Sequence, residues 1–235
     1  MKKTLLTVVL FALALGTACG QKLTGAGATF PYPIYAKWFS EYNAAHPGVS
    51  IRYRAEGSGA GIRQVAAGVV DFGATDAPMT DSQLAASRTR LVHIPALMGA
   101  VVPIFHVQGV SHLQLGGEVL ADIYLGRITQ WNDPRIAHDN PDARLPDLKI
   151  VAVHRSESSG TSFIFTDYLS KVSRAWAGGP ERSAAPDWPV GVGALRNDGV
   201  ARVVGATDGA LGYVELIYAL ENRLEFGEVR NSTGN

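Results

Sequence analysis

Residues 22–45, KLTGAGATFPYPIYAKWFSEYNAA, carry the pattern from which the fold can be predicted. The run from Lys22 to Gly25 is strand-like, and a turn rich in glycine and proline separates it from a helical pattern that extends from about Pro33 to Ala45. The same order continues along the chain, with strand-like runs at 49–54 and 69–74 on either side of a helix near 61–67. Such alternation of strands and helices is typical of a parallel α/β layer.

A second set of elements predicts a second lobe. It consists of an apolar run at 99–107, a helical stretch near 117–125, a strand at 149–154 and a helix from about 160 to 174. The composition of 127–146 and 178–189, rich in residues that favour turns, indicates loops. We therefore predict an α/β protein of two lobes, with the first lobe at 21–90 and the second at 91–235.

The bulk composition fits a globular protein and excludes some function classes. The chain has 235 residues, of which 46% are hydrophobic and 18% are charged, enough to bury a core. Its 21 basic residues balance its 21 acidic residues, so no overall field attracts nucleic acid or an anionic membrane. Specificity for an anion must therefore come from a local site, and we expect no nucleic-acid partner.

The first twenty residues have the pattern of a signal peptide. Two lysines precede an apolar run at 5–15 that is too short for a transmembrane helix, so we expect export to the periplasm or to the outer face of the cytoplasmic membrane. Small residues before Gln21 fit cleavage there, whereas the residues up to Cys19 resemble a lipoprotein box, and both alternatives stay open. Cys19 is the one cysteine of the sequence, so we expect no disulfide, and a lipid on Cys19 as the single link to a membrane.

Three segments share a further pattern: a strand-like run, a small hydroxyl residue next to glycine, and the start of a helix. Such a turn places free backbone N–H groups and the positive end of a helix dipole beside a hydroxyl donor, an arrangement that binds phosphate-like anions. A single serine or threonine at this place is usually only a helix cap, but three in one chain favour an anion site. The segments are GAGATFP at 25–31, with Thr29 as the expected cap, GSGAG at 57–61, and SSGTS at 158–162.

Two charged residues lie next to these turns. Arg155 follows a predicted strand, where its guanidinium is placed for a bidentate pair with an oxyanion, although a surface arginine would give the same pattern. Asp76 follows the run at 70–75, at the carboxyl end of a strand, where open α/β sheets bind ligands, although a turn can also place an acid there. A carboxylate suits hydrogen phosphate, which keeps a proton to donate, and disfavours sulfate, which has none. The donors would supply affinity, and Asp76 would supply selectivity.

The sequence resembles the phosphate-binding receptors of the phosphate-specific ABC transport system, from Leu23 to about Asn222. The segments that carry the resemblance are LTGAGATFPYPIYAKW at 23–38, VDFGATDAPM at 70–79, DIYLGRITQWND at 122–133, SSGTSFIFTDYL at 158–169, NDGV at 197–200 and GALGYVE at 209–215. The resemblance implies a two-lobed, type II-like periplasmic-binding-protein fold that closes on phosphate and delivers it to a permease and ATPase complex. We expect a monomeric binding protein without a cofactor or a bound metal, and not an enzyme.

The resemblance also implies the ligand residues and shows three departures. A second serine that commonly follows Ser58 is a glycine here, and the acid after the arginine is Glu157, whose length we expect to orient Arg155 less tightly. Relatives continue beyond Asn235 with a segment that completes the first-lobe sheet, so we expect the first lobe to be incomplete. The positions that match the family's phosphate ligands are Thr29, Phe30, Ser58, Asp76, Arg155, Ser159, Gly160 and Thr161.

Other function classes fit the sequence less well. A serine hydrolase would need a GxSxG elbow, and a phosphoryl-transfer enzyme would need a GxxxxGK[ST] loop or magnesium carboxylates. The histidines lack the paired spacing of a metal site, and CxxC is absent. They are His46, His93, His106, His112, His138 and His154. The alternative that stays open is a binding protein or sensor for phosphate or another oxyanion without a role in transport, including a truncated non-functional relative.

Overall fold

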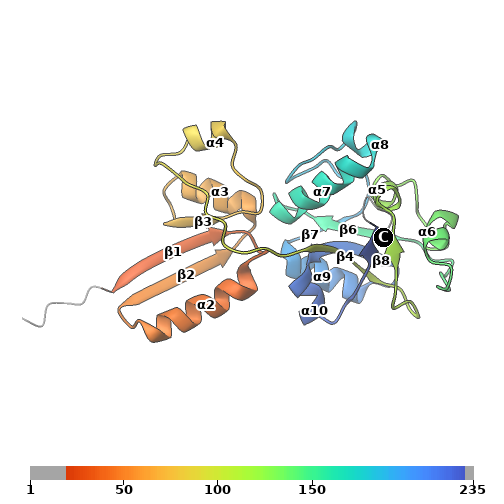
Figure 1. The fold of residues 1–235 in the computed structure, drawn as a ribbon, viewed down its shortest axis with the longest axis horizontal. Coiled ribbons are helices and arrows are strands. Elements are labelled where there is room, and N and C mark those ends of the chain that lie inside the picture. The colour runs from red at the N-terminus through yellow and green to blue at the C-terminus, as the bar shows by residue number, and fades with distance from the viewer. Residues whose placement is uncertain (1–19, 231–235) are drawn as a thin grey trace, which may run out of the picture.

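The computed structural model describes residues 20–230, which form two α/β lobes that lie side by side (Figure 1). The predicted signal peptide, with Cys19, lies outside the described residues except for Gly20. Between residues 20 and 230, no helix combines the length and the hydropathy that crossing a membrane requires.

The first lobe contains the parallel sheet that the sequence predicts, in the strand order β2-β1-β3. Its strands are β1 (Gln21–Gly27), β2 (Val49–Ala55) and β3 (Phe72–Ala74), and its helices are α2 (Tyr32–Ala45), α3 (Ser58–Ala66) and α4 (Asp81–Ala85). Helices α2 and α3 lie on opposite sides of the sheet (Figure 1). Gly61 allows α3 to pack directly on the strand backbone, because a Cβ atom there would lie 2.6 Å from the Cα atom of Gly27.

The interior of the first lobe is thin and aromatic. Its core cluster contains three buried hydrophobic residues, Ala28, Phe30 and Ala74, and none of the α2 residues is buried. The α2 side chains instead pack on the sheet through partly exposed rings, with the Tyr35 and Tyr53 ring centroids 5.3 Å apart and edge to face. The first lobe is therefore covered on this side by half-buried aromatic contacts rather than by a closed aliphatic core.

Residues 90–100 connect the lobes without forming a helix or a strand. Several large hydrophobic side chains of this segment are exposed, with 70% of Val92, 79% of Ile94 and 96% of Met98 accessible to solvent. A cluster of exposed apolar side chains in one segment is unusual on the surface of a soluble protein.

The second lobe contains a mixed sheet in the order β7-β6-β8-β4-β9. Strand β8 pairs in parallel with β6 and in antiparallel orientation with β4. The strands of this lobe are β4 (Val101–His106), β6 (Val151–Arg155), β7 (Val192–Ala194), β8 (Ala210–Glu215) and β9 (Glu225–Phe226), with a separate pair of β5 (Gln114–Leu115) and β10 (Glu228–Val229). The helices are α5 (Gly117–Tyr124), α6 (Pro134–Asp139), α7 (Gly160–Val172), α8 (Arg174–Ala177), α9 (Arg196–Ala206) and α10 (Leu216–Glu221).

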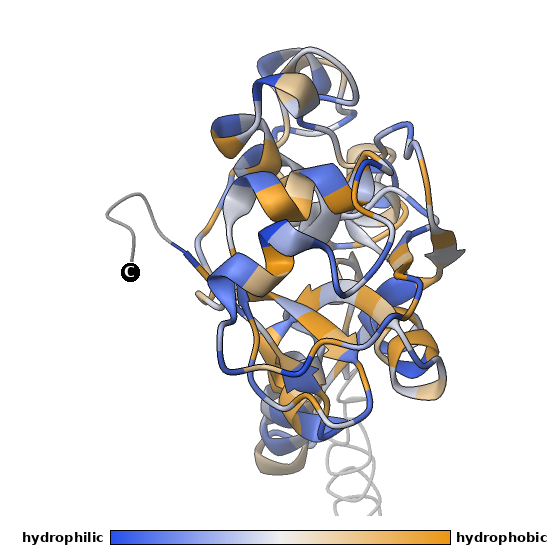
Figure 2. Cartoon of the chain, turned by 90° about the vertical axis from the view of Figure 1, so that its right-hand side faces the viewer, coloured by the Kyte–Doolittle hydropathy of each residue, from blue (hydrophilic) through white to orange (hydrophobic). Residues whose placement is uncertain are grey.

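Alternating side chains of this sheet enter two different cores. Phe105, Ala152 and Tyr213 face a cluster with residues of α5 and α7, whereas Ile104 and Val153 face a cluster with residues of α9 and α10. This alternation follows from the period of two in a strand, and it gives a sheet covered by helices on both faces. In Figure 2, which views this end of the molecule, the central strands are largely hydrophobic and the surrounding loops carry more of the hydrophilic residues.

The sequence-based elements differ from the structure in three respects. The predicted loop at 127–146 contains α6, which begins at Pro134 after Asp133, whose carboxylate accepts a hydrogen bond from the backbone N–H of Arg135. The predicted helix at 160–174 ends at Val172, and Ser173 caps the short α8 instead. The sequence patterns assign no element beyond residue 189, where the structure has β7, α9, β8 and α10.

Candidate anion-binding site

The predicted site residues lie at strand ends and helix starts where the two lobes meet. Strands β1 and β2 point toward the second lobe in Figure 1. Thr29 and Phe30 follow β1, and Asp76 lies two residues after β3. Arg155 ends β6, Ser58 begins α3, and Ser159 precedes α7, whose first residues are Gly160 and Thr161. The carboxyl ends of strands are the usual ligand-binding edge of an α/β sheet.

Direct contacts link these residues both within the first lobe and across the two lobes. The Ser58 hydroxyl donates a hydrogen bond to Oδ2 of Asp76 at 3.4 Å, and the backbone N–H of Gly59 donates across the lobes to the carbonyl of Ser158 at 3.2 Å. A Cβ atom on Gly160 would lie 2.5 Å from both Asp76 Oδ2 and Ser58 Oγ. Any side chain at position 160 would therefore push the first-lobe residues away from the start of α7.

Most of the predicted residues are buried although they are polar. Thr29, Ser58 and Arg155 are each at most 3% exposed, and Ser159 and Thr161 are fully buried. Phe30 is also buried, with its ring beside Gly99, whereas Asp76 is partly buried. Polar groups are rarely buried without partners, because each loses its hydrogen bonds to water.

Glu157 is the partner of the buried Arg155 guanidinium. Its Oε1 atom accepts hydrogen bonds from Nη2 and, at 2.8 Å, from Nε of Arg155. One oxygen of Glu157 thus meets two guanidinium nitrogens, whereas its buried Oε2 atom has no hydrogen-bond partner among the described residues. That the longer acid orients Arg155 less tightly than a shorter one stays a prediction. The remaining nitrogen, Nη1, donates to Oγ1 of Thr161 at 3.4 Å and so faces the start of α7.

The Asp76 carboxyl group has an unusual proton affinity. Burial raises its pKa from 3.8 to about 7, in spite of the nearby Arg155 charge and the Ser58 hydrogen bond, which lower it, while Glu215 adds a smaller increase. Near neutral pH this group therefore exchanges between a hydrogen-bond acceptor and a donor. Strongly shifted pKa values of this kind are frequent at functional sites.

The three predicted turns use their hydroxyl groups in different ways. Ser159 caps α7, because its Oγ atom accepts a hydrogen bond from the backbone N–H of Ser162 at 3.2 Å. The prediction that Thr29 caps α2 is wrong: Pro31 occupies the N-cap position, and the Thr29 hydroxyl is bound elsewhere. Ser58 is the first residue of α3 and does not cap it. In the first turns of α3 and α7, the backbone N–H of Gly59 is already bonded to the Ser158 carbonyl and that of Ser162 to the Ser159 hydroxyl.

Three further residues surround the site without having been assigned a role from the sequence. The amide nitrogen of Asn197 lies 2.8 Å from the Thr29 hydroxyl, and the Tyr218 hydroxyl donates to the Thr29 carbonyl at 2.7 Å. The Tyr213 hydroxyl accepts from the backbone N–H of Arg155 at 3.2 Å. All three lie within or beside the NDGV and GALGYVE segments, so the sequence marks their location but not their partners.

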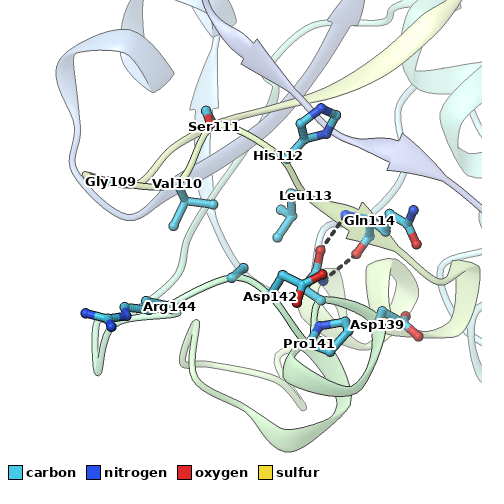
Figure 3. A pocket seen from close by; sticks show the side chains of 12 residues that line it. Gly109, Val110, Ser111, His112, Leu113, Gln114, Asp139, Pro141, Asp142 and Arg144 are labelled. Atoms are coloured by element: carbon cyan, nitrogen blue, oxygen red, sulfur yellow. Dashed lines mark hydrogen bonds between the residues drawn. The ribbon is translucent and has the colours of Figure 1, made fainter.

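A pocket lies away from these residues, at the loop end of the second lobe. It has a volume of about 600 Å³ and is lined by residues 109–114 and 139–144 (Figure 3). The dashed lines in Figure 3 mark the two hydrogen bonds that join the Asn140 side chain to the backbone of Gln114. None of the predicted site residues lines this pocket. Within residues 20–230, the structure contains no group of three or more His, Cys, Asp or Glu side chains arranged to hold a metal ion.

Comparisons with known proteins place this chain in a family. A family model described as a PBP superfamily domain matches residues 14–233. The phosphate-binding protein PstS of Pasteurella multocida is 44% identical over 235 residues, which cover 99% of this chain and 67% of that protein. The chain belongs to the PstS family of the PBP superfamily. This result confirms the resemblance that the sequence motifs indicate.

Two other comparisons define the extent of the match to the PstS family. PstS of Xylella fastidiosa is 44% identical over 91% of this chain and 58% of its own length. A periplasmic phosphate-binding protein, PfluDING, solved with bound phosphate, matches the fold with a TM-score of 0.71 at 23% identity, over 91% of this chain and 63% of that protein. The chain thus spans about three fifths to two thirds of the length of these PstS relatives, and the expected two-lobed α/β fold is confirmed.

Proposed function

We propose that the chain binds inorganic phosphate between its two lobes, at the hydrogen-bond donors and the Asp76 carboxylate described above. The observation that carries this proposal is the position of Asp76, a partly buried acid with a pKa of about 7, next to the Ser58 hydroxyl and close to the buried Arg155. The PstS relatives are named as phosphate-binding proteins, which supports the same ligand. The proposed ligand residues are Thr29, Phe30, Ser58, Asp76, Arg155, Ser159, Gly160 and Thr161.

The lobes in this proposal are residues 21–90 and 91–235. Each contributes half of the ligand residues, so phosphate bound between them holds both lobes at once. The Gly59 to Ser158 hydrogen bond supports this arrangement, because it already brings the two lobes into contact beside the ligand residues.

In the cell, we propose that the protein is an exported receptor that delivers phosphate to the permease and ATPase of an ABC importer, acting as a monomer. The PstS family is one of substrate-binding proteins rather than enzymes, which supports this assignment. A phosphate sensor without a transporter is the competing role. Loss of high-affinity phosphate uptake on deletion of the gene, restored by the intact gene, would support the transport role, whereas normal uptake would favour a sensor.

Selectivity for phosphate over sulfate follows from the number of protons at the site. Hydrogen phosphate and the Asp76 carboxylate share one proton in a hydrogen bond, whereas sulfate and the carboxylate have none to share and repel each other. Below a pH of about 7, Asp76 gains its own proton and can donate it to sulfate. We therefore expect discrimination against sulfate to be strong at pH 8 and to weaken as the pH falls below 7.

Titration calorimetry with phosphate and with sulfate tests this proposal. Asp76→Asn replaces the acceptor oxygen by an amide and should reduce the preference for phosphate at pH 8 at least tenfold. Asp81→Asn, an exposed acid of the same lobe, is the matched control and should leave the preference unchanged. A preference that stays the same in Asp76→Asn would show that Asp76 does not select the ligand.

Affinity is tested at Arg155. Its guanidinium is buried, so Arg155→Ala should weaken phosphate binding by about 2 kcal/mol or more, as expected for a desolvated charge pair. Arg202→Ala, whose side chain is 75% exposed, is the control and should have no measurable effect. An unchanged affinity in Arg155→Ala would remove this residue from the site.

A further inference from the structure

Asn197 is a fully buried residue at the start of α9, in contact with ligand residues of both lobes. The residue before it, Arg196, has a φ angle of 62°, a left-handed conformation that non-glycine residues rarely adopt. The backbone N–H of Arg196 donates to Oε1 of Glu157 at 3.1 Å, the oxygen that also holds Arg155. Strained backbone of this kind persists where surrounding contacts fix it, often beside functional groups.

The orientation of the Asn197 amide is determined by its oxygen. Oδ1 accepts a hydrogen bond from the backbone N–H of Glu215 at 3.2 Å. A backbone N–H can only donate, so the atom facing it must be the amide oxygen, and the NH₂ group must point the other way. The NH₂ group therefore faces the two threonine hydroxyls.

The Asn197 nitrogen donates to Oγ1 of Thr29 at 2.8 Å and to Oγ1 of Thr161 at 3.4 Å. An amide nitrogen carries two protons and no free acceptor, so both threonines receive hydrogen bonds from it. Thr161 also receives one from Arg155, which occupies its second lone pair. The hydroxyl protons of Thr29 and Thr161 are consequently free to point toward another acceptor.

We propose that Asn197 is a positioning residue that holds the Thr29 and Thr161 hydroxyls as donors toward a bound phosphate and joins the two lobes through them. The inference rests on the proposed function, because phosphate is the acceptor that these protons require. Tyr218 contributes to the same arrangement, since its hydroxyl holds the Thr29 carbonyl and so fixes the Thr29 backbone. Asn197 itself need not touch the ligand.

Two variants test this role by titration calorimetry with phosphate. Asn197→Ala leaves the Thr29 and Thr161 hydroxyls free to rotate and should lower the affinity for phosphate about tenfold. Asn197→Asp keeps the shape but replaces the NH₂ donor by a carboxylate oxygen. This oxygen turns the hydroxyl protons away from the ligand and adds a negative charge that repels phosphate, so the loss of affinity should reach about a hundredfold. Because Asn197→Asp preserves the packing, the test stands even if Asn197→Ala does not fold.

The matched control is Asn140→Ala, which removes another buried asparagine of the second lobe. Asn140 bonds the backbone of Gln114 and Ile136, remote from the predicted ligand residues. It should lower the stability of the lobe without changing the affinity for phosphate. Stopped-flow measurements should also show that Asn197→Ala raises the dissociation rate more than it lowers the association rate, because closure is what it weakens.

A double-mutant cycle with Thr29→Val separates positioning from a purely structural effect. If Asn197 acts through the Thr29 hydroxyl, the neutral variant Asn197→Ala should lose much less affinity in the Thr29→Val background than in the unmodified protein. Additive effects, or an unchanged affinity in both Asn197 variants, would overturn the inference while leaving the proposed function intact. Absence of phosphate binding by the unmodified protein would instead overturn the proposed function, and the inference with it.

Discussion

The two lobes supply equal numbers of the proposed ligand residues but differ in how they are held together. The first lobe has a three-stranded sheet and a core cluster of Ala28, Phe30 and Ala74. The second lobe has a five-stranded sheet with a core on each face, and it contains the largest fully buried side chains of the described residues, among them Trp131 and Trp176. The difference indicates that the second lobe is the stable platform and that the first lobe depends on contacts made across the site.

The largest expected contrast is between a tryptophan of each lobe. Trp131 is fully buried and its indole N–H donates to the Gly209 carbonyl at 2.9 Å, so Trp131→Ala should reduce the free energy of unfolding by about 3 to 5 kcal/mol. Trp38→Ala, at a side chain that is 43% exposed, should change it by less than about 1 kcal/mol. Urea unfolding followed by circular dichroism measures both. Equal losses would contradict the proposed division between the lobes.

The next largest effect concerns how the stability of the protein without ligand depends on pH. The pKa of Asp76 is raised from 3.8 to about 7 on folding, so the folded state holds this proton more tightly than the unfolded state. Stability should therefore fall as the pH rises from about 4 to about 7, by on the order of 3 kcal/mol at 1.36 kcal/mol per pKa unit.

Asp76→Asn should remove this decline, which urea unfolding between pH 4 and pH 8 without phosphate would detect. Asp81→Asn serves as the control, because its exposed carboxylate should leave the slope unchanged. The same slope in Asp76→Asn as in the unmodified protein would mean that burial does not raise the Asp76 pKa.

Phosphate itself should reduce the difference between the lobes. A ligand at a hundred times its Kd stabilises the bound state by about 2.7 kcal/mol. Hydrogen exchange should slow most in β1, β3 and α3, because the first lobe has the smaller core and opens more readily without ligand. Sulfate at the same concentration and at pH 8 is the control. Equal slowing in β6 and β8 would show that the lobes open together.

Removal of either of two helix caps should have the smallest effect, a loss of about 1 kcal/mol of helix or protein stability. Ser173 accepts a hydrogen bond from the backbone N–H of Trp176, which belongs to the second-lobe core, so Ser173→Ala should lower the global stability. Thr80→Ala breaks the capping box of α4, a helix without buried residues, and should increase only local hydrogen exchange. A global loss in Thr80→Ala would show that α4 supports the first-lobe core.

The sequence predicts the parts of the fold that depend on local pattern. The parallel sheet of the first lobe follows from alternating strands and glycine-rich turns, and Ser159 caps α7 as its position before Gly160 suggests. The α6 helix within 127–146 was not predictable from composition, because its six residues offer too little periodicity and its cap depends on Asp133. Short elements of this kind are decided by packing and capping rather than by propensity.

The candidate site shows the same limit at longer range. The motifs identify which residues gather at the site, yet the Thr29 hydroxyl binds Asn197, 168 residues away, rather than the helix that follows it. Likewise, one Glu157 oxygen meets two guanidinium nitrogens of Arg155, a geometry that the sequence does not specify. Partners of this kind depend on how the lobes close and on side-chain geometry, neither of which a local pattern contains.

All six residues of β8 are buried, and this strand and the start of α10 supply three of the site's supports: the Tyr213 hydroxyl, the Glu215 backbone N–H and the Tyr218 hydroxyl. Because side chains alternate along a strand, deleting one residue here would exchange the two core faces and move all three supports together. The stretch from Ala210 to Tyr218 should therefore be the least tolerant of insertions and deletions, since no single compensating substitution can restore both the packing and the site.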